Sequence, residues 1–125
     1  MNDSKLWKVF SEYIRRRDAD KDGNCKCFTC NLVRNWKQMD CGHGIPRQHK
    51  ATKFSEINNH AQCKRCNGFE GGKREVYKVE VDKRYGPGTW HKLELASKIT
   101  LKRTQFEIDT MTEFYKQELK KLKHS

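Results

Sequence analysis

Polar side chains that can move protons or hold a hard cation gather in the middle of this chain. The set comprises Asp40, His43, Arg47, His49, Asn58, Asn59, His60 and Asn67. Histidine titrates near neutral pH and can deprotonate a water molecule, and one Asp together with one Asn can hold magnesium through oxygen ligands. Arg47 or Lys73 can hold a phosphate. These residue types favour phosphodiester hydrolysis, in which water attacks while negative charge grows on the phosphoryl oxygens.

Two Cys-x-x-Cys pairs, Cys27 with Cys30 and Cys63 with Cys66, enclose most of this polar set. Each pair can turn two sulfurs toward one ion, so the two pairs predict a tetrahedral thiolate site for a structural zinc ion. Cys25 is an alternative to Cys27, but its spacing to Cys30 would be Cys-x4-Cys, and Cys27 is therefore preferred. The remaining cysteine, which follows Asp40, is interpreted as a small buried residue.

Composition limits the classes to which the protein can belong. The 125 residues include 27 Lys and Arg, 16 Asp and Glu, and only 34% hydrophobic residues, with a net charge of +11. A chain of this length forms one small domain, and its low apolar content predicts a thin core that needs a staple. We expect a soluble cytosolic protein, because no apolar run could cross a membrane or serve as a secretory signal. Cysteines in a reducing compartment favour metal ligation, and the positive charge predicts a nucleic-acid partner.

Helices are expected at both ends of the chain. Apolar residues from Leu6 to Ile14 recur at helical spacing and predict an amphipathic helix over residues 4 to 17. Its terminal arginines, 15 to 17, either contact phosphate or form a solvated end that suits the helix dipole. Near the C-terminus, Thr104 and Glu107 form a capping-box pair ahead of an apolar stripe that extends to Leu122.

The intervening segments are less regular. Residues 33–39 and 42–46 are candidate strands that could form two sides of a hairpin or a loop-strand unit. Residues 76–81 favour a helix, although their β-branched content leaves a strand open. The basic residues after the second cysteine pair predict a DNA-binding surface, with a solvated face as the alternative. They are Lys73, Arg74, Lys78, Lys83, Arg84 and the basic stretch 116–123.

Three sequence features together resemble the HNH nucleases, which are also called His-Me finger or ββα-metal nucleases. They are the stretch Asp-Cys-Gly-His-Gly-Ile-Pro at 40–46, an Asn five residues before Cys63, and Asn67 directly after Cys66. The cysteine pairs, the Gly-His and the run at 59–67 are similar to the phage lambda NinG (Rap) recombination endonucleases, which act on branched DNA. The similarity covers about residues 27–73. Endonuclease VII is similar in two features. It has a zinc-bound Cys-x-x-Cys pair followed directly by Asn, and an Asp three residues before a His.

The resemblance implies roles for individual residues. It implies that His43 is the general base, that Asn58 orients its imidazole, and that Asn67 binds the catalytic metal. Most HNH enzymes carry Asp or His just before the catalytic His, whereas this chain has Gly42, which cannot ligate. Asp40 shares a strand face with residue 42 and matches the metal-binding Asp of endonuclease VII. In the alignment with endonuclease VII, however, the catalytic imidazole would fall at residue 41, which is a cysteine.

The remaining candidate site residues include two that have more than one possible role. Arg47 is expected to hold the scissile phosphate. His60 either supports the active site, binds phosphate, or packs beside the zinc. Asn67 could instead be a turn residue after the cysteine pair.

The expected fold class is α+β, a small zinc-stapled ββα-metal (His-Me finger) core flanked by N- and C-terminal helices. One domain, 1–125, is expected to comprise an N-terminal helix at 1–20, a zinc-bound catalytic core at 25–73 and a basic helical tail at 74–125. The long apolar stripe near the C-terminus suggests a homodimer.

The leading functional expectation is a DNA endonuclease with structural Zn²⁺ and catalytic Mg²⁺ or Mn²⁺. By resemblance, it acts on branched DNA such as Holliday junctions or D-loops in the bacterial host cytoplasm. The alternative is a non-catalytic zinc-ribbon DNA-binding module. A hydrolase with catalytic zinc is disfavoured, because four thiolates close the coordination shell.

Overall fold

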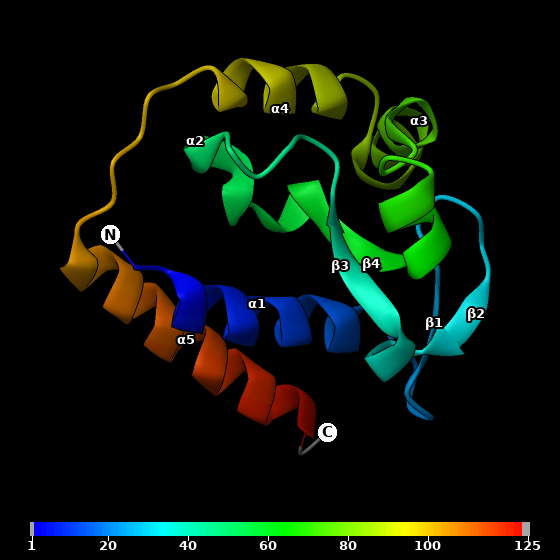
Figure 1. Cartoon of the computed structure of the whole chain (residues 1–125), viewed down its shortest axis with the longest axis horizontal. Coiled ribbons are helices and arrows are strands. Elements are labelled where there is room, and N and C mark those ends of the chain that lie inside the picture. Colours follow the sequence, from blue (N-terminus) through cyan, green and yellow to red (C-terminus); the bar gives the residue numbers. More distant parts are fainter. Residues whose placement is uncertain (1, 124–125) are drawn as a thin grey trace.

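Helices surround a central two-stranded hairpin in the computed structural model, which describes residues 2–123 (Figure 1). The expected segments that include Met1, His124 and Ser125 lie partly outside the described residues. The principal elements are α1(Ser4–Arg17), β1(Asn24–Lys26), β2(Val33–Asn35), β3(Met39–His43), α2(Lys50–Lys53), β4(Asn59–Cys63), α3(Arg74–Tyr85), α4(Thr89–Ser97) and α5(Gln105–Lys123). Two short 3-10 turns, Trp36–Gln38 and Glu56–Asn58, precede β3 and β4, and a π-helical turn, η3(Arg65–Phe69), follows β4.

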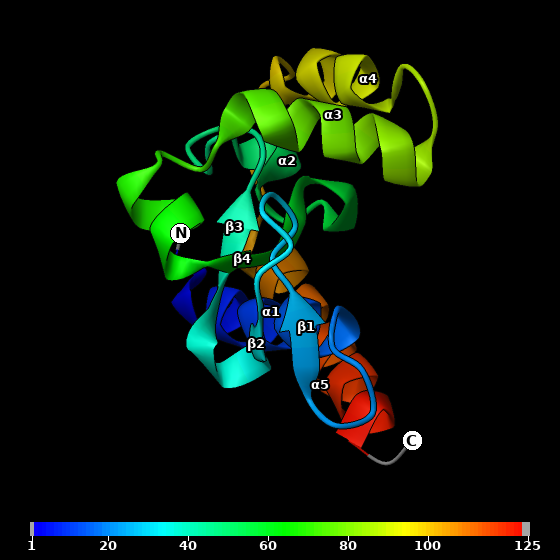
Figure 2. The same cartoon turned by 90° about the vertical axis from the view of Figure 1, so that its right-hand side faces the viewer.

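The two terminal helices confirm their sequence predictions. In α1, Leu6, Phe10 and Ile14 are fully buried, as the apolar spacing predicts. The capping box at the start of α5 is present: Thr104 N donates to Glu107 Oε1 at 3.0 Å and Glu107 N donates to Thr104 Oγ1 at 3.1 Å. Helix α5 lies along α1 in both views (Figures 1 and 2), so the two helices bury their apolar faces against each other.

The predicted hairpin between residues 33–39 and 42–46 is wrong, because the strands pair differently in the structure. Strand β2 pairs with β1, and β3 pairs antiparallel with β4, in a register that places Asp40 opposite Gln62 and His43 opposite Asn59. All residues of β4 are buried, so its sequence lacks the alternation of polar and apolar residues that marks a half-exposed strand. The pairing partner of β3 was therefore missed in the sequence.

Helices α3 and α4 cover the opposite side of the hairpin from α1 (Figure 1). The segment 76–81 is helical, as favoured, and the strand alternative is wrong. The sequence analysis missed α4, which contributes Trp90 and Leu93 to a buried cluster with Tyr77 and Val81. The small mixed α+β class is confirmed, and three modest apolar clusters replace one large core. Among residues 2–123, no helix combines the length and apolarity needed to cross a membrane.

Candidate functional site

The four predicted cysteine ligands come together in one cluster. The sulfur atoms of Cys27, Cys30, Cys63 and Cys66 all lie within 4.8 Å of one another. Zinc–sulfur bonds of about 2.3 Å in a tetrahedron place sulfurs about 3.8 Å apart. The Sγ atoms of Cys30 and Cys63 are 3.7 Å apart, so the spacing fits a metal ion of this kind. Four cysteines are thus positioned to hold a metal ion, consistent with structural zinc.

Backbone turns bring the thiols to this position. After β1, Cys27 N donates to Leu32 O at 2.8 Å, and Asn31, with φ of 66°, closes the turn that carries Cys30. Burial raises the pKa of Cys66 to about 12. Burial also opposes ionisation of Cys27, but hydrogen bonds from Thr29 and nearby backbone amides outweigh it and lower the pKa of Cys27 to about 6. Four adjacent thiols cannot all ionise without a cation, and this favours metal ligation.

The two remaining cysteines stay outside the cluster. Cys25 is buried in β1 but is not one of the four clustered thiols, so the choice of Cys27 over Cys25 agrees with the geometry. Cys41 is buried against α1, with its Sγ 3.6 Å from Asn59 Oδ1. Its interpretation as a small buried residue is confirmed.

The structure brings Asp40 and Asn67 into direct contact beside the thiol cluster. Asn67 Nδ2 donates to Asp40 Oδ2 at 3.0 Å, and Lys64 Nζ lies 2.7 Å from Asp40 Oδ1. Asp40 projects from β3, whereas Lys64 and Asn67 come from the turn that follows β4. Carboxylate and amide oxygens are ligands that hard divalent ions prefer, and in this structure the Lys64 ammonium occupies the position beside Asp40 Oδ1.

Gln62 fills the space that a side chain at position 42 would need. A Cβ added at Gly42 would lie 1.8 Å from Gln62 Oε1 and 2.6 Å from Gln62 Cδ. Gln62 Nε2 is fixed by Thr29 Oγ1 and by Gly72 O, each at 3.0 Å, so its side chain has little freedom to move aside. A carboxylate at position 42 would therefore clash, and Asp40 is the acidic side chain that β3 offers on this face.

His43 lies at the end of β3 and packs against α1. Its ring stacks on Trp7, with 4.9 Å between centroids, and its Nε2 is 3.3 Å from Lys53 O. Burial, followed by the charges of Arg47 and Lys53, lowers the pKa of His43 to about 4. Strand alternation places residues 40 and 43 on opposite faces of β3. The imidazole therefore does not touch Asp40 or Asn67 directly.

A groove of about 370 Å³ contains Asp40 and Asn67. His43 does not line this groove, but Trp7 does, and the Trp7 ring stacks on His43. We call this groove the cationic groove. It is lined by Trp7, Ser11, Arg15, Lys37, Met39, Asp40, Cys41, Arg47, Lys64 and Asn67. Four of these side chains are cationic and one is acidic, so the groove suits an anionic ligand. Arg47, a predicted site residue, lies over the Trp7 ring at 5.8 Å from its centroid.

Asn58 holds the loop that follows His43. Its Oδ1 accepts from Ile45 N at 2.7 Å, and its Nδ2 donates to Ile45 O at 3.1 Å and to Thr52 O at 3.2 Å. The side chain is fully buried and makes no recorded bond to the imidazole. Asn58 can therefore position His43 only through the backbone of this loop.

His60 is a packed core residue in this structure. Its ring nitrogens lie 2.8 Å from Tyr77 Oη and 2.7 Å from Tyr85 Oη, and Phe28 stacks on the ring at 3.8 Å. Burial lowers the pKa of His60 to about 2. With both nitrogens engaged and no exposed surface, His60 is not brought into the cationic groove.

Several groove residues were not singled out in the sequence. Trp7, Lys37 and Lys64 are far apart in the chain or lie in segments assigned only structural roles, whereas Arg15 was a candidate phosphate contact. The available signal for Lys64 was its place between two metal-binding cysteines. Trp7 carried no comparable signal, because a helix pattern does not tell which residues face another element.

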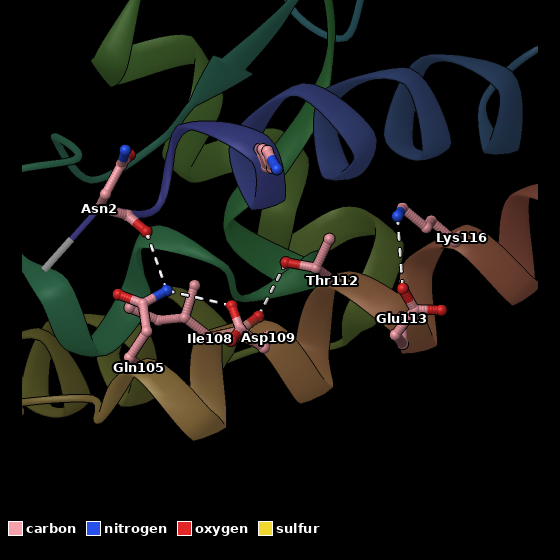
Figure 3. Close-up of a pocket in the computed structure, with 8 residues that line it drawn as sticks. Asn2, Gln105, Ile108, Asp109, Thr112, Glu113 and Lys116 are labelled. Carbon is pink, nitrogen blue, oxygen red and sulfur yellow. Dashed lines mark hydrogen bonds and ion pairs between the residues drawn. The ribbon is translucent and has the colours of Figure 1, made fainter.

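Another hollow, of about 460 Å³, lies between the start of α1 and α5 (Figure 3). Its polar groups largely satisfy one another: Gln105 Nε2 donates to Asn2 O at 3.4 Å and to Asp109 Oδ1 at 3.0 Å, and Lys116 pairs with Glu113 at 3.3 Å. None of the predicted site residues lines it. This hollow is accordingly not a candidate for the site.

The fold and the thiol cluster define a small α+β protein with a four-cysteine metal-type site beside a cationic groove. The family model described as Bacteriophage Lambda NinG protein matches residues 2–125, and the chain belongs to this family. Searches of curated proteins and of solved structures gave no match. The family resemblance is thus confirmed across nearly the whole chain. The similarity to HNH nucleases and endonuclease VII stays a prediction.

Proposed function

We propose that this protein is a metal-dependent endonuclease that hydrolyses phosphodiester bonds in DNA, with a His-Me finger arrangement. The observation that carries this proposal is the 3.0 Å contact between Asp40 and Asn67 inside the cationic groove. The antiparallel β3–β4 pair, followed by η3 and α3, supplies the strand–strand–helix order of that arrangement. The four-cysteine cluster then acts as a structural zinc site that fixes η3 to the hairpin.

Asp40 and Asn67 would hold the catalytic Mg²⁺ or Mn²⁺. Rotation of the Asn67 amide by half a turn would present its oxygen in place of Nδ2. The Lys64 ammonium would have to move away from Asp40 Oδ1 when the ion binds, because two cations at one carboxylate oxygen repel each other. The bound ion would neutralise charge on the phosphoryl and leaving oxygens. Arg47, on the same groove wall, would hold the scissile phosphate.

His43 would act as the general base through Nδ1. A carbonyl oxygen can only accept, so the bond to Lys53 O requires that Nε2 carry the hydrogen and leaves Nδ1 as an acceptor. The lowered pKa keeps the imidazole neutral at pH 7. Because strand alternation places Asp40 and His43 on opposite faces of β3, and Trp7 stacks on the imidazole, DNA would have to pass beside the Trp7 ring to contact both parts of the site.

From the resemblance to the NinG recombination endonucleases, we propose branched recombination intermediates, such as Holliday junctions or D-loops, as the DNA substrate in the host cytoplasm. A homodimer would allow two strands of a junction to be cut together. Helix α5 keeps Phe106 and Phe114 exposed at 79% and 53%, and these rings would form the self-association surface.

Cleavage of a synthetic Holliday junction by the purified protein tests the proposal. Wild-type protein should cut with Mg²⁺ or Mn²⁺, whereas His43→Ala and Asp40→Asn should each lower the rate about 10²- to 10⁴-fold, the usual contribution of such groups. His91→Ala is the matched control, because His91 is exposed on α4 and remote from the groove residues in the sequence. A wild type that binds DNA but never cuts it would instead support the zinc-ribbon binding module.

A further inference from the structure

Phe69 is the most exposed large apolar side chain among the described residues. It is 95% exposed and ends η3, two residues after Asn67. Figure 2 shows the segment between β4 and α3 standing out from the body of the molecule. Full exposure of a phenyl ring is unfavourable in water, and a protruding ring beside a candidate active site calls for a binding partner.

The turn that presents Phe69 is held in place. Gly72 N donates to Cys66 O at 2.8 Å, Glu70 N donates to Arg65 O at 2.9 Å, and Gln62 Nε2 donates to Gly72 O. Cys66 belongs to the thiol cluster, so metal binding there would fix the base of the same turn. The ring is therefore displayed on an anchored segment.

The surroundings of Phe69 indicate what it contacts. Lys64 and Arg65 in the same turn have side chains that are 68% and 80% exposed. Arg65 pairs with Glu70 at 3.3 Å, whereas Lys73 adds a further positive charge where α3 begins. A phenyl ring flanked by cations suits nucleic acid, because bases can stack on the ring while the cations contact phosphates.

We propose that Phe69 stacks on a nucleobase that is unpaired or unstacked at a DNA branch and thereby positions the branch at Asp40 and Asn67. This inference rests on the proposed action on DNA. In continuous duplex the bases already stack on one another, so inserting the ring requires unstacking a base step. At a branch or gap that cost is reduced. Phe69 is thus a specificity-determining residue that favours branched over linear DNA.

Equilibrium binding measured by fluorescence anisotropy tests the inference, with no divalent metal added so that cleavage is not needed. Phe69→Ala should weaken binding to a four-way junction about 5- to 150-fold, the range for loss of one stacked base, while duplex binding changes less than about twofold. Phe69→Trp should retain junction binding. Leu95→Ala, which removes another exposed apolar side chain from α4, should leave both affinities unchanged.

A spectroscopic readout separates stacking from a merely structural effect. 2-Aminopurine placed at the branch should lose fluorescence when wild-type protein binds and keep it with Phe69→Ala. Thermal unfolding should be unchanged by Phe69→Ala, because the ring contributes almost no buried surface.

Three results would overturn the inference: equal loss of junction and duplex binding, no change in either, or a change of oligomeric state at unchanged DNA affinity. The last would show that the ring contacts a second copy of the chain. Failure of the nuclease proposal is distinguishable, since junction-selective binding by Phe69 can persist without cleavage, and cleavage can persist without any effect of Phe69→Ala.

Discussion

The hydrogen bond between His43 Nε2 and Lys53 O determines which nitrogen can act on water. A histidine in solution exchanges freely between tautomers, but this carbonyl selects the form with hydrogen on Nε2. Burial and the neighbouring charges of Arg47 and Lys53 then oppose a second proton and lower the pKa to about 4. In the proposed mechanism, His43 would therefore be neutral, with Nδ1 free to accept a proton, before any substrate binds.

This environment predicts the pH dependence of cleavage. As pH falls through about 4, Nδ1 takes up a proton and the base is lost, so kcat/KM should stay high down to about pH 5. An ordinary histidine would lose activity near pH 6.5. Steady-state kinetics on junction DNA from pH 4 to 8 measures the acidic limb.

The cation at Arg47 provides a control for the pH prediction. Because its charge lowers the pKa of His43, Arg47→Ala should raise that pKa and shift the acidic limb to higher pH, in addition to any loss of phosphate binding. NMR titration of the His43 ring in the free protein reports the same shift without catalysis. An acidic limb near pH 6.5 in the wild type would contradict the assignment of His43 as base.

At the scale of elements, the thiol cluster connects segments that share few apolar contacts. Cys27 and Cys30 follow β1, whereas Cys63 ends β4 and Cys66 lies in η3. The neighbouring apolar cluster consists mainly of cysteines, with Met39 and Ala61. A bound ion would therefore replace the core that this end of the molecule lacks.

Removal of the ion should consequently unfold this end of the protein. Cys63→Ser, or chelation of zinc from the wild type, should lower the midpoint of thermal unfolding by 10 °C or more, roughly what loss of several kcal/mol produces in a domain of this size. Circular dichroism measures the melt, and a metal assay should find about one zinc per wild-type chain.

Cys25→Ala is the matched control for this experiment. Cys25 is buried in β1 like its neighbours but lies outside the four-thiol cluster, so this variant should keep its zinc and lose only the small packing contribution of one sulfur. An unchanged melting temperature after complete removal of zinc would show that the cluster does not stabilise the fold.

Short-range sequence patterns correctly predicted those elements whose structure depends on residues close together in the sequence. The apolar spacing of α1, the capping box of α5 and the Cys-x-x-Cys turns all reappear in the structure. Strand pairing was not predictable in the same way, because β3 meets β4 across a long intervening loop. The role of His60 was also open until its partners Tyr77 and Tyr85 were known, since both lie in a helix distant in sequence.

Across the whole molecule, the positive charge is distributed differently from the sequence expectation. The sequence analysis assigned the DNA-binding surface mainly to the basic residues after the second cysteine pair, with Arg15 and Arg47 as separate candidate phosphate contacts. The cationic groove takes Arg15, Lys37 and Arg47 from the residues before that pair. In the C-terminal helix, Lys116 pairs with Glu113 and Lys121 pairs with Glu118. These pairs offset much of the charge of the basic tail. In the groove, four cationic side chains accompany one acidic side chain, so part of the net charge of +11 lies there.

Salt dependence of DNA binding tests this distribution. Each phosphate contact contributes about 0.9 to the slope of log affinity against log salt, because counterions are released from the duplex. Lys37→Ala and Arg47→Ala, which remove exposed groove cations, should each reduce the slope by about one contact and weaken binding at low salt. Lys116→Ala and Lys121→Ala remove the same charge from α5 and should leave the slope unchanged. Anisotropy titrations over 50 to 300 mM salt measure these slopes. If the α5 variants lower the slope and the groove variants do not, DNA lies along the tail and the proposed site is in the wrong place.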